Sequence, residues 1–319
     1  MTPIKNILVL LSILLFLAKT SFAVISDFDE EKFLLDILWH KTKTLQENKL
    51  PCVALVLGGG GARGFAHVGV LQVFQEEQIP VDLVVGTSVG SIVGALYCAG
   101  LPFEHLEDDI EDFDIKDISN FSSASILKML LSGHLLSNKK LENFIDGKIG
   151  SITFDQLQTR LVCVATDLIT GERILLREGS VSFAARASAT IPGIFQPVEY
   201  NQRYLVDGGL AENIPVGVAK VFKADVIIAV PVSADITKSD ISSVFLTLMQ
   251  AIYIQGQVLD QYNLKIADII IRPNVGDLNA INFKEAYKTI DKGFIAAKSA
   301  VKDIKKAIIN KIEESVLIE

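Results

Sequence analysis

Two glycine-rich turns in the first third of the chain carry the residue types of an acyl-transfer site. One is Gly58–Gly64 (GGGGARG) and the other is Gly86–Gly90 (GTSVG), and each follows a short apolar run and opens a helix-like stretch. The first turn offers a row of backbone N–H groups that can hold an oxyanion. The second presents a serine at a sharp strand-to-helix corner, as a nucleophile elbow does.

The serine of the second turn, Ser88, is the candidate nucleophile. The apolar run Val81–Val85 predicts a buried parallel strand, and Ile92–Cys98 predicts the helix packed behind it. Gly86 and Gly90 leave room for a close approach of strand and helix, and the helix N-terminus favours a developing negative charge. Taken alone, the same five residues also fit a helix N-cap serine between packing glycines.

The first turn has a competing interpretation. Gly59, Gly61 and Gly64 match the dinucleotide-binding pattern G-x-G-x-x-G between a predicted strand and a predicted helix. That fold also needs an acidic residue at the end of its second strand, whereas Asp82 lies at the start of this one. The sequence therefore disfavours a dinucleotide-binding oxidoreductase but keeps it as an alternative.

A base is needed to activate the serine, and histidine is its usual partner. The chain has four histidines, and none follows His134, so the order Ser, acid, His of the α/β-hydrolases is excluded. His67 is predicted to be a partly buried helix residue. Asp207, which ends an apolar run and precedes Gly208 and Gly209, is the candidate acid. On its own, this segment also fits an ordinary Asp-Gly turn.

In their order and spacing, the three motifs Gly59–Gly64, Gly86–Gly90 and Asp207–Gly209 resemble the bacterial-type patatin-like phospholipases. These enzymes are similar in catalytic core to cytosolic phospholipase A2 and use a Ser-Asp dyad without histidine. Val164–Glu172 and Ala185–Pro192 also look like segments of that family. The resemblance spans about Cys52 to Arg272, and Gly293–Ala297 also looks family-like. With the alternation of predicted strands and helices, it implies a three-layer α/β/α fold around a mainly parallel central sheet.

The resemblance implies a role for each matching residue. Ser88 would be the nucleophile of a serine acyl hydrolase acting on phospholipid or lysophospholipid esters at a membrane surface, and Asp207 its general base. The oxyanion hole would come from Gly59, Gly60, Gly61, Arg63 and Gly64, with the Val89 N–H as a further donor. Elbow and dyad would be supported by Gly86, Gly90, Gly208 and Gly209. Arg63 fits either a loop-holding role, which we favour, or a contact to an anionic head group. We hypothesise that partial burial raises the pKa of Asp207.

Other functions fit the same residues. A broad esterase or thioesterase would use the same dyad, and a non-catalytic lipid-binding or partner-binding protein would keep the fold alone. A net charge of −8 disfavours nucleic acid as a partner. No cofactor or metal is predicted, because the three cysteines lack ligand spacing and the acidic run Glu104–Asp117 lacks the EF-hand pattern. The oligomeric state is not predicted.

Four segments are expected along the chain. Residues 1–23, with Lys5 before an apolar run and a small-x-small site ending at Ala23, predict a signal peptide for a periplasmic or secreted protein. An uncleaved membrane anchor is the alternative. Residues 24–50 form a helical lead-in, 51–275 the catalytic domain, and 276–319 a helical segment packed on it. Phe121–Leu136 fits a lipid-facing lid, although packing as core fits equally well.

Overall fold

The computed structural model describes residues 29–42, 45, 50–102, 135–233, 242, 244–276, 278, 280 and 282–318. The chain forms two compact units, Met1–Leu45 and Gln46–Glu319, and the first contains helix α2 (Glu30–Thr42). The predicted signal peptide, the acidic run at 104–117 and nearly all of the predicted lid at 121–136 lie outside the described residues. None of the helices in the described part is both long and apolar enough to cross a membrane.

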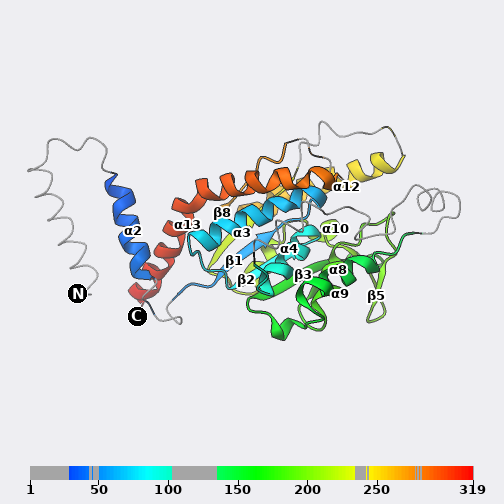
Figure 1. Cartoon of the computed structure of the whole chain (residues 1–319), viewed down its shortest axis with the longest axis horizontal. Helices are drawn as coiled ribbons and strands as arrows, with labels where there is room; N and C mark the ends of the chain where they lie inside the picture. Colours follow the sequence, from blue (N-terminus) through cyan, green and yellow to red (C-terminus); the bar gives the residue numbers. More distant parts are fainter. Residues whose placement is uncertain are drawn as a thin grey trace, which may run out of the picture. The chain divides into compact units, whose positions relative to one another are not determined.

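The second unit is built on an eight-stranded mixed sheet (Figure 1). Its order is β5-β6-β3-β2-β1-β7-β8, with β4 paired to β3. Neighbouring strands among β3, β2, β1, β7 and β8 are parallel, whereas β4 and β6 run antiparallel to β3, and β5 runs antiparallel to β6. The strands are β1 (Val53–Leu57), β2 (Leu83–Thr87), β3 (Arg160–Asp167), β4 (Arg173–Leu176), β5 (Val198–Tyr200), β6 (Arg203–Asp207), β7 (Val226–Val230) and β8 (Ile269–Ile270).

Helical layers cover both faces of this sheet. On one face, Leu57, Val84 and Leu161 lie against Gly94 of helix α4 (Val89–Cys98). The alternate residues face the other way and pack on helix α11 (Val216–Val221) and the short helix η5 (Leu264–Ile266). Burial on both faces explains why β1 is apolar at every position, as central parallel strands are. The predicted three-layer fold is confirmed.

Helices α3 and α13 lie side by side, and α3 begins just after the glycine-rich turn (Figure 1). Helix α3 (Ala66–Glu76) follows the 3₁₀ helix η2 (Gly61–Phe65), and α13 (Ile290–Ile318) follows η6 (Phe283–Thr289). A Cβ atom at Gly69 of α3 would lie 2.0 Å from the Ile290 carbonyl oxygen, and one at Gly293 of α13 would lie 1.8 Å from the Ala66 oxygen. The two backbones are therefore in direct contact, which anchors the beginning of α3.

The corner stays at Ser88, but the strand and helix that flank it reach two to three residues closer to it than predicted. Strand β2 extends to Thr87, and α4 begins at Val89 and not at Ile92. The helix starts this early because the N–H groups of Ser91 and Ile92 already donate to the Ser88 carbonyl oxygen. The remaining helices within the described residues are α8 (Lys139–Ile149), η3 (Phe154–Gln156), α9 (Val181–Ser188), α10 (Gly209–Glu212) and α12 (Val244–Asn263).

Candidate active site

Ser88 occupies the single-residue corner between β2 and α4. Its backbone has φ 55° and ψ −125°, a conformation that side-chain-bearing residues rarely adopt and that stores strain. A Cβ atom at Gly90 would lie 2.1 Å from the Leu57 carbonyl oxygen, and one at Gly86 would lie 2.6 Å from the Gly90 oxygen. Both positions accept only glycine, because strand β1, strand β2 and helix α4 meet here without room for a side chain.

The Ser88 hydroxyl points at Asp207. Its Oγ donates to Asp207 Oδ2 over 2.6 Å, although the two residues stand 119 apart in the chain. The Gly209 N–H donates to the other carboxylate oxygen over 2.8 Å. Burial raises the pKa of Asp207 to about 6, against the lowering effect of these two hydrogen bonds. The direction is the one hypothesised from the sequence, and it yields a carboxylate that accepts a proton more readily than an exposed aspartate does.

One short segment holds both members of this pair. Thr190 accepts a hydrogen bond from the Asp207 N–H through its carbonyl oxygen over 2.8 Å, and the Ser188 carbonyl oxygen accepts the Gly208 N–H over 3.3 Å. The Ser188 side chain accepts the Ser88 N–H over 2.9 Å. Residues 188–190 therefore set the backbone of the nucleophile and of the acid at the same time.

The Ser188 hydroxyl is itself fully bonded. Its Oγ donates to the Val164 carbonyl oxygen over 2.5 Å, so the hydrogen in its 2.8 Å contact with Ser91 comes from the Ser91 hydroxyl. All three serines of this cluster are buried, and a Cβ at Gly208 would lie 2.1 Å from that Val164 oxygen. Sequence reasoning noted Ser188 only as part of a family-like segment and assigned it no role.

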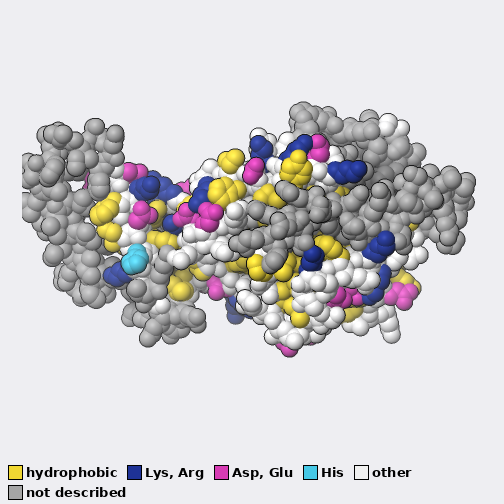
Figure 2. All heavy atoms as spheres, viewed as in Figure 1, with side chains coloured by type: hydrophobic (Ala, Val, Ile, Leu, Met, Phe, Trp, Pro, Cys, Tyr) yellow, Lys and Arg dark blue, Asp and Glu magenta, His cyan; other side chains and the backbone are white. Residues whose placement is uncertain are grey.

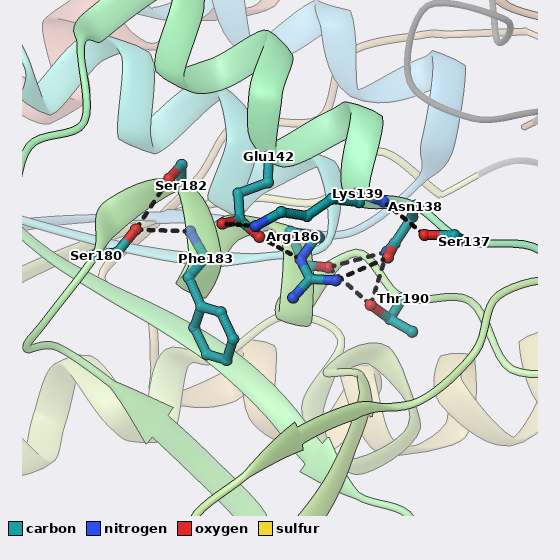
Figure 3. A network of polar contacts seen from close by, with 9 residues as sticks. All are labelled: Ser137, Asn138, Lys139, Glu142, Ser180, Ser182, Phe183, Arg186 and Thr190. Carbon is teal, nitrogen blue, oxygen red and sulfur yellow. Dashed lines mark hydrogen bonds and ion pairs between the residues drawn. The ribbon is translucent and has the colours of Figure 1, made fainter.

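A polar network behind residues 188–190 ties them to helix α8 (Figure 3). Arg186 Nε lies 2.7 Å from Glu142 Oε2, and Lys139 also forms an ion pair with Glu142. Asn138 Nδ2 donates to Thr190 Oγ1 over 2.9 Å, and that hydroxyl donates to the Arg186 carbonyl oxygen over 2.8 Å. The network fixes the C-terminal end of α9, from which the contacts to Asp207 arise.

The glycine-rich turn lies against the nucleophile. A Cβ atom at Gly59 would lie 3.1 Å from Ser88 Cβ, and the Gly59 N–H is already used, since it donates to the Asn213 carbonyl oxygen over 3.2 Å. The N–H groups of Gly60 and Gly61 have no hydrogen-bond acceptor within the described part of the chain. Among the described residues, these two N–H groups of the predicted oxyanion hole are therefore without a competing acceptor.

Arg63 and Gly64 make the contacts that hold the turn in place. The Arg63 side chain is buried, its Nε donates to the Gly60 carbonyl oxygen over 3.1 Å, and its guanidinium lies 5.7 Å from the ring centre of Tyr253. A Cβ atom at Gly64 would lie 2.1 Å from Val89 Cγ1, so Gly64 brings the turn against the start of α4. These contacts are those of the loop-holding alternative for Arg63.

Asn213 and Asp260, which the sequence analysis did not single out, also support the glycine-rich turn. Asn213 Nδ2 donates to Asp260 Oδ2 over 3.2 Å, while the Asn213 carbonyl oxygen accepts the Gly59 N–H. Asp260 is buried, and burial raises its pKa to about 6. The sequence carried one signal for Asp260, because it is the one charged residue in the twenty-residue segment that forms α12.

His67 plays a structural part. It is fully buried, more deeply than the sequence predicted, because α3 packs closely against neighbouring elements along its length. Its Nε2 lies 2.8 Å from the Gly58 carbonyl oxygen, and burial lowers its pKa to about 4. A neutral imidazole therefore donates to the first residue of the glycine turn. The described residues contain no cluster of His, Cys, Asp or Glu suited to a metal ion, and all three cysteines are free thiols, with Cys52 half-buried.

Fold and site together define a class: an α/β protein whose elbow serine is hydrogen-bonded to an aspartate beside a glycine-rich turn. The family model described as patatin-like phospholipase matches residues 55–220 of the chain. Because this match covers half of the chain, the protein belongs to the patatin-like phospholipase family.

Relatives extend this assignment. An uncharacterised NTE family protein of Mycobacterium tuberculosis is 34% identical over 184 residues, which cover 56% of this chain and 49% of that protein. The lysophospholipase NTE1 of Candida glabrata is 31% identical over 198 residues, covering 57% of this chain and 10% of the yeast protein. The chain thus spans about half the length, or less, of the curated relatives it matches.

Two solved structures share the fold. VipD from Legionella pneumophila superimposes with a TM-score of 0.52 at 14% identity, covering 80% of this chain and 67% of VipD. Human GIVD cytosolic phospholipase A2 superimposes with a TM-score of 0.50 at 10% identity, covering 90% of this chain and 67% of the human protein. At these identities the likeness concerns the fold alone.

Proposed function

We propose that the protein is a serine acyl hydrolase that cleaves ester bonds of phospholipids or lysophospholipids. The observation that carries the proposal is the 2.6 Å hydrogen bond from Ser88 Oγ to Asp207 at a strained corner, next to a turn with two available N–H groups. Membership of the patatin-like phospholipase family supports a lipid ester as substrate. The name of the yeast relative, a lysophospholipase, supports the same class.

In the first half of the reaction, the Asp207 carboxylate takes the hydroxyl proton as Ser88 Oγ attacks the ester carbonyl carbon. The carbonyl oxygen becomes an oxyanion, which the N–H groups of Gly60 and Gly61 can hold. The Val89 N–H, the first of helix α4, has no intrahelical acceptor and can join them. Collapse of the tetrahedral intermediate breaks the ester C–O bond, and the leaving alcohol receives the proton from Asp207.

In the second half, water replaces the alcohol. Asp207 accepts a proton from the water molecule that attacks the acyl-enzyme, and the second tetrahedral intermediate expels Ser88 Oγ, which recovers its proton. The products are a fatty acid and the free enzyme. The cycle uses no redox change, and its proton transfers run through one carboxylate.

The test is fatty-acid release from phosphatidylcholine vesicles and from a soluble short-chain ester, with chelator present. We expect Ser88→Ala and Asp207→Asn to lower kcat/KM on both substrates by at least about a thousandfold. The matched controls, Ser299→Ala and Asp303→Asn at exposed positions of α13, should leave it unchanged. Labelling of Ser88 by a fluorophosphonate, seen as a mass shift of its peptide, gives a readout that does not depend on the substrate chosen.

Other results would contradict the proposal. Turnover of the soluble ester without any release from vesicles would indicate a broad esterase or thioesterase. A folded wild-type protein that turns over neither substrate and takes up no fluorophosphonate would indicate a fold kept for binding alone. Full activity of Asp207→Asn would show that another group is the base.

We also propose that residues 1–23 direct export and are removed, with a membrane-anchored form as the alternative. Lys5, the apolar run that follows it and the small residues Ser21 and Ala23 support this. Fractionation of the source cells, with N-terminal sequencing, should find the mature protein outside the cytoplasm with Val24 as its first residue. Retention of the intact N-terminus in the membrane fraction would favour the anchor instead.

A further inference from the structure

Among the described side chains of helix α12, polar contacts to the rest of the protein lie on one side and exposed apolar side chains lie on the other. On the inner side, Asp260 is buried against Asn213, and Tyr253, seven residues earlier, lies against Arg63. Residues seven apart fall on the same helix face.

The outward side forms a continuous apolar strip. We call this strip the outer face of α12; it extends into η5 and consists of Leu248, Ile254, Val258, Leu259, Tyr262 and Ile266, with 60, 46, 51, 38, 66 and 39% of their surfaces exposed. Single exposed apolar residues are common, but a row of this kind along one helix is typical of an interaction surface. No charged residue interrupts the face within α12, since Asp260 points the other way.

Building on the proposed lipid hydrolase activity, we propose that the outer face of α12 docks the enzyme onto a lipid surface. The link between this face and the candidate active site through a single helix carries the proposal. The same helix that presents the outer face holds, through Tyr253 and Asp260, the residues Arg63 and Asn213. These two residues fix the glycine-rich turn beside Ser88. A lipid surface bound to the outer face is therefore separated from the glycine-rich turn by α12 alone.

The chemistry of the face fits a lipid better than a second protein copy. A stable protein interface uses about 20–30 residues from each partner, whereas the outer face offers six. At its C-terminal end, the Tyr262 ring lies 5.2 Å from Lys265 Nζ, which gives an aromatic residue with a polar rim of the kind found at the bilayer interface.

Electrostatic attraction contributes little to this docking. The protein has a net charge of −8, and on the surface seen in Figure 2 the described acidic and basic side chains are interspersed, without a continuous patch of either sign. Binding should therefore depend on apolar contact, extend to zwitterionic lipid, and change little with ionic strength.

The experiment measures binding without turnover. Mature protein that begins at Val24 and carries Ser88→Ala is sedimented with phosphatidylcholine vesicles at low and high salt, alone and with Leu248→Lys plus Val258→Lys. The double change should lower the vesicle partition coefficient about tenfold or more, because two apolar side chains are lost from the contact. The matched control is Ile295→Lys plus Val221→Lys, which alters side chains of α13 and α11 that are 60 and 65% exposed and should bind normally.

A second measurement uses the same variants with Ser88 restored. The double change in α12 should lower kcat/KM on vesicles by a similar factor and leave kcat/KM on the soluble ester within about twofold. Equal loss on both substrates, unchanged vesicle binding, or absence of vesicle binding by the parent protein would overturn the docking proposal. So would a dimer in solution that the α12 change dissociates, since the face would then belong to a second copy.

Failure of the proposed function is distinguishable from failure of docking. If wild type hydrolyses neither substrate while the Ser88→Ala protein still binds vesicles through α12, the hydrolase assignment fails and the docking face stands. If wild type hydrolyses both substrates and the α12 change affects neither, the hydrolase assignment stands and docking fails.

Discussion

The corner around Ser88 and the outer face of α12 are linked through one helix and are built in opposite ways. At the corner, hydrogen bonds set each polar atom and a single methyl group has no room, as the 2.1 Å approach at Gly90 shows. The outer face of α12 exposes apolar side chains whose positions fix no reacting atom. Catalytic geometry depends on individual distances, whereas surface docking depends on apolar area and the absence of charge. Variants in the two regions should therefore fail in different assays.

The largest expected effect comes from adding one methyl group at the corner. Gly90→Ala places Cβ 2.1 Å from a backbone oxygen that cannot move without displacing β1, so we expect a loss of about 3 kcal/mol or more in the free energy of unfolding, or failure to fold. The measurement is denaturant unfolding. Gly147→Ala in α8, where an added Cβ meets nothing within 4 Å, should be neutral or slightly stabilising. A Gly90→Ala protein of normal stability would show that the corner does have room for a methyl group, which would contradict the contrast with the outer face of α12.

The second effect is on pH dependence. Because a protonated Asp207 cannot accept the Ser88 proton, kcat/KM on the soluble ester should fall about tenfold per unit as the pH decreases below about 6. Vesicle binding by Ser88→Ala should stay constant over the same range, since the outer face carries no ionisable acid or base that titrates there.

Asp260 is the control for assigning the ionisation in the activity profile to Asp207. Burial raises the pKa of Asp260 to about 6 as well, so the two aspartates cannot be told apart by midpoint alone. Asp260→Asn should keep the midpoint of the activity profile. If the midpoint disappears in Asp260→Asn, the ionising group is Asp260, which supports the glycine-rich turn. A profile without any ionisation above pH 5 would contradict a raised pKa for Asp207.

Ser188→Ala should have a smaller effect. It removes the acceptor of the Ser88 N–H and the donor to the Val164 oxygen, which leaves buried groups unpaired at about 1–3 kcal/mol of stability. We expect kcat to fall about tenfold with KM unchanged, on both the soluble ester and vesicles, as measured by steady-state kinetics. Ser299→Ala on α13 serves as the control. A loss of stability with unchanged kcat would show that Ser188 supports the fold and does not position the nucleophile.

The smallest expected effect is a gain in stability. Because burial raises the pKa of Asp207, the folded state favours the neutral acid. The stability that this preference contributes is lost as the pH rises from near 4 through about 6. The amide side chain of the Asp207→Asn variant is neutral throughout, so this protein should be more stable than wild type by about 1 kcal/mol at pH 7.5, with the difference shrinking toward pH 4. Denaturant unfolding at both pH values measures this, and Asp303→Asn should show no such trend.

The motifs of the site could be recognised from the sequence because their conformational demands are local. Glycines on both sides of Ser88, four consecutive glycines after an apolar run, and Asp207 before two glycines each restrict the backbone within a few residues. The same holds for the parallel strands, whose continuous apolar runs require burial on both faces. Element boundaries were less accurate, as the early start of α4 shows, because they depend on which hydrogen bonds the corner forms.

The sequence by itself determined which residues are candidates for the chemistry, and the tertiary structure alone decided which contacts hold them in place. Ser88 meets Asp207 because the strand order β6-β3-β2 brings their two strand ends together, and Ser188 reaches the Ser88 N–H across 100 residues. The inward position of Asp260 and the outward apolar side of α12 likewise depend on how that helix lies against Asn213 and Arg63. Residue spacing encodes local backbone conformation, whereas contacts between distant segments arise only when packing selects one arrangement of the elements.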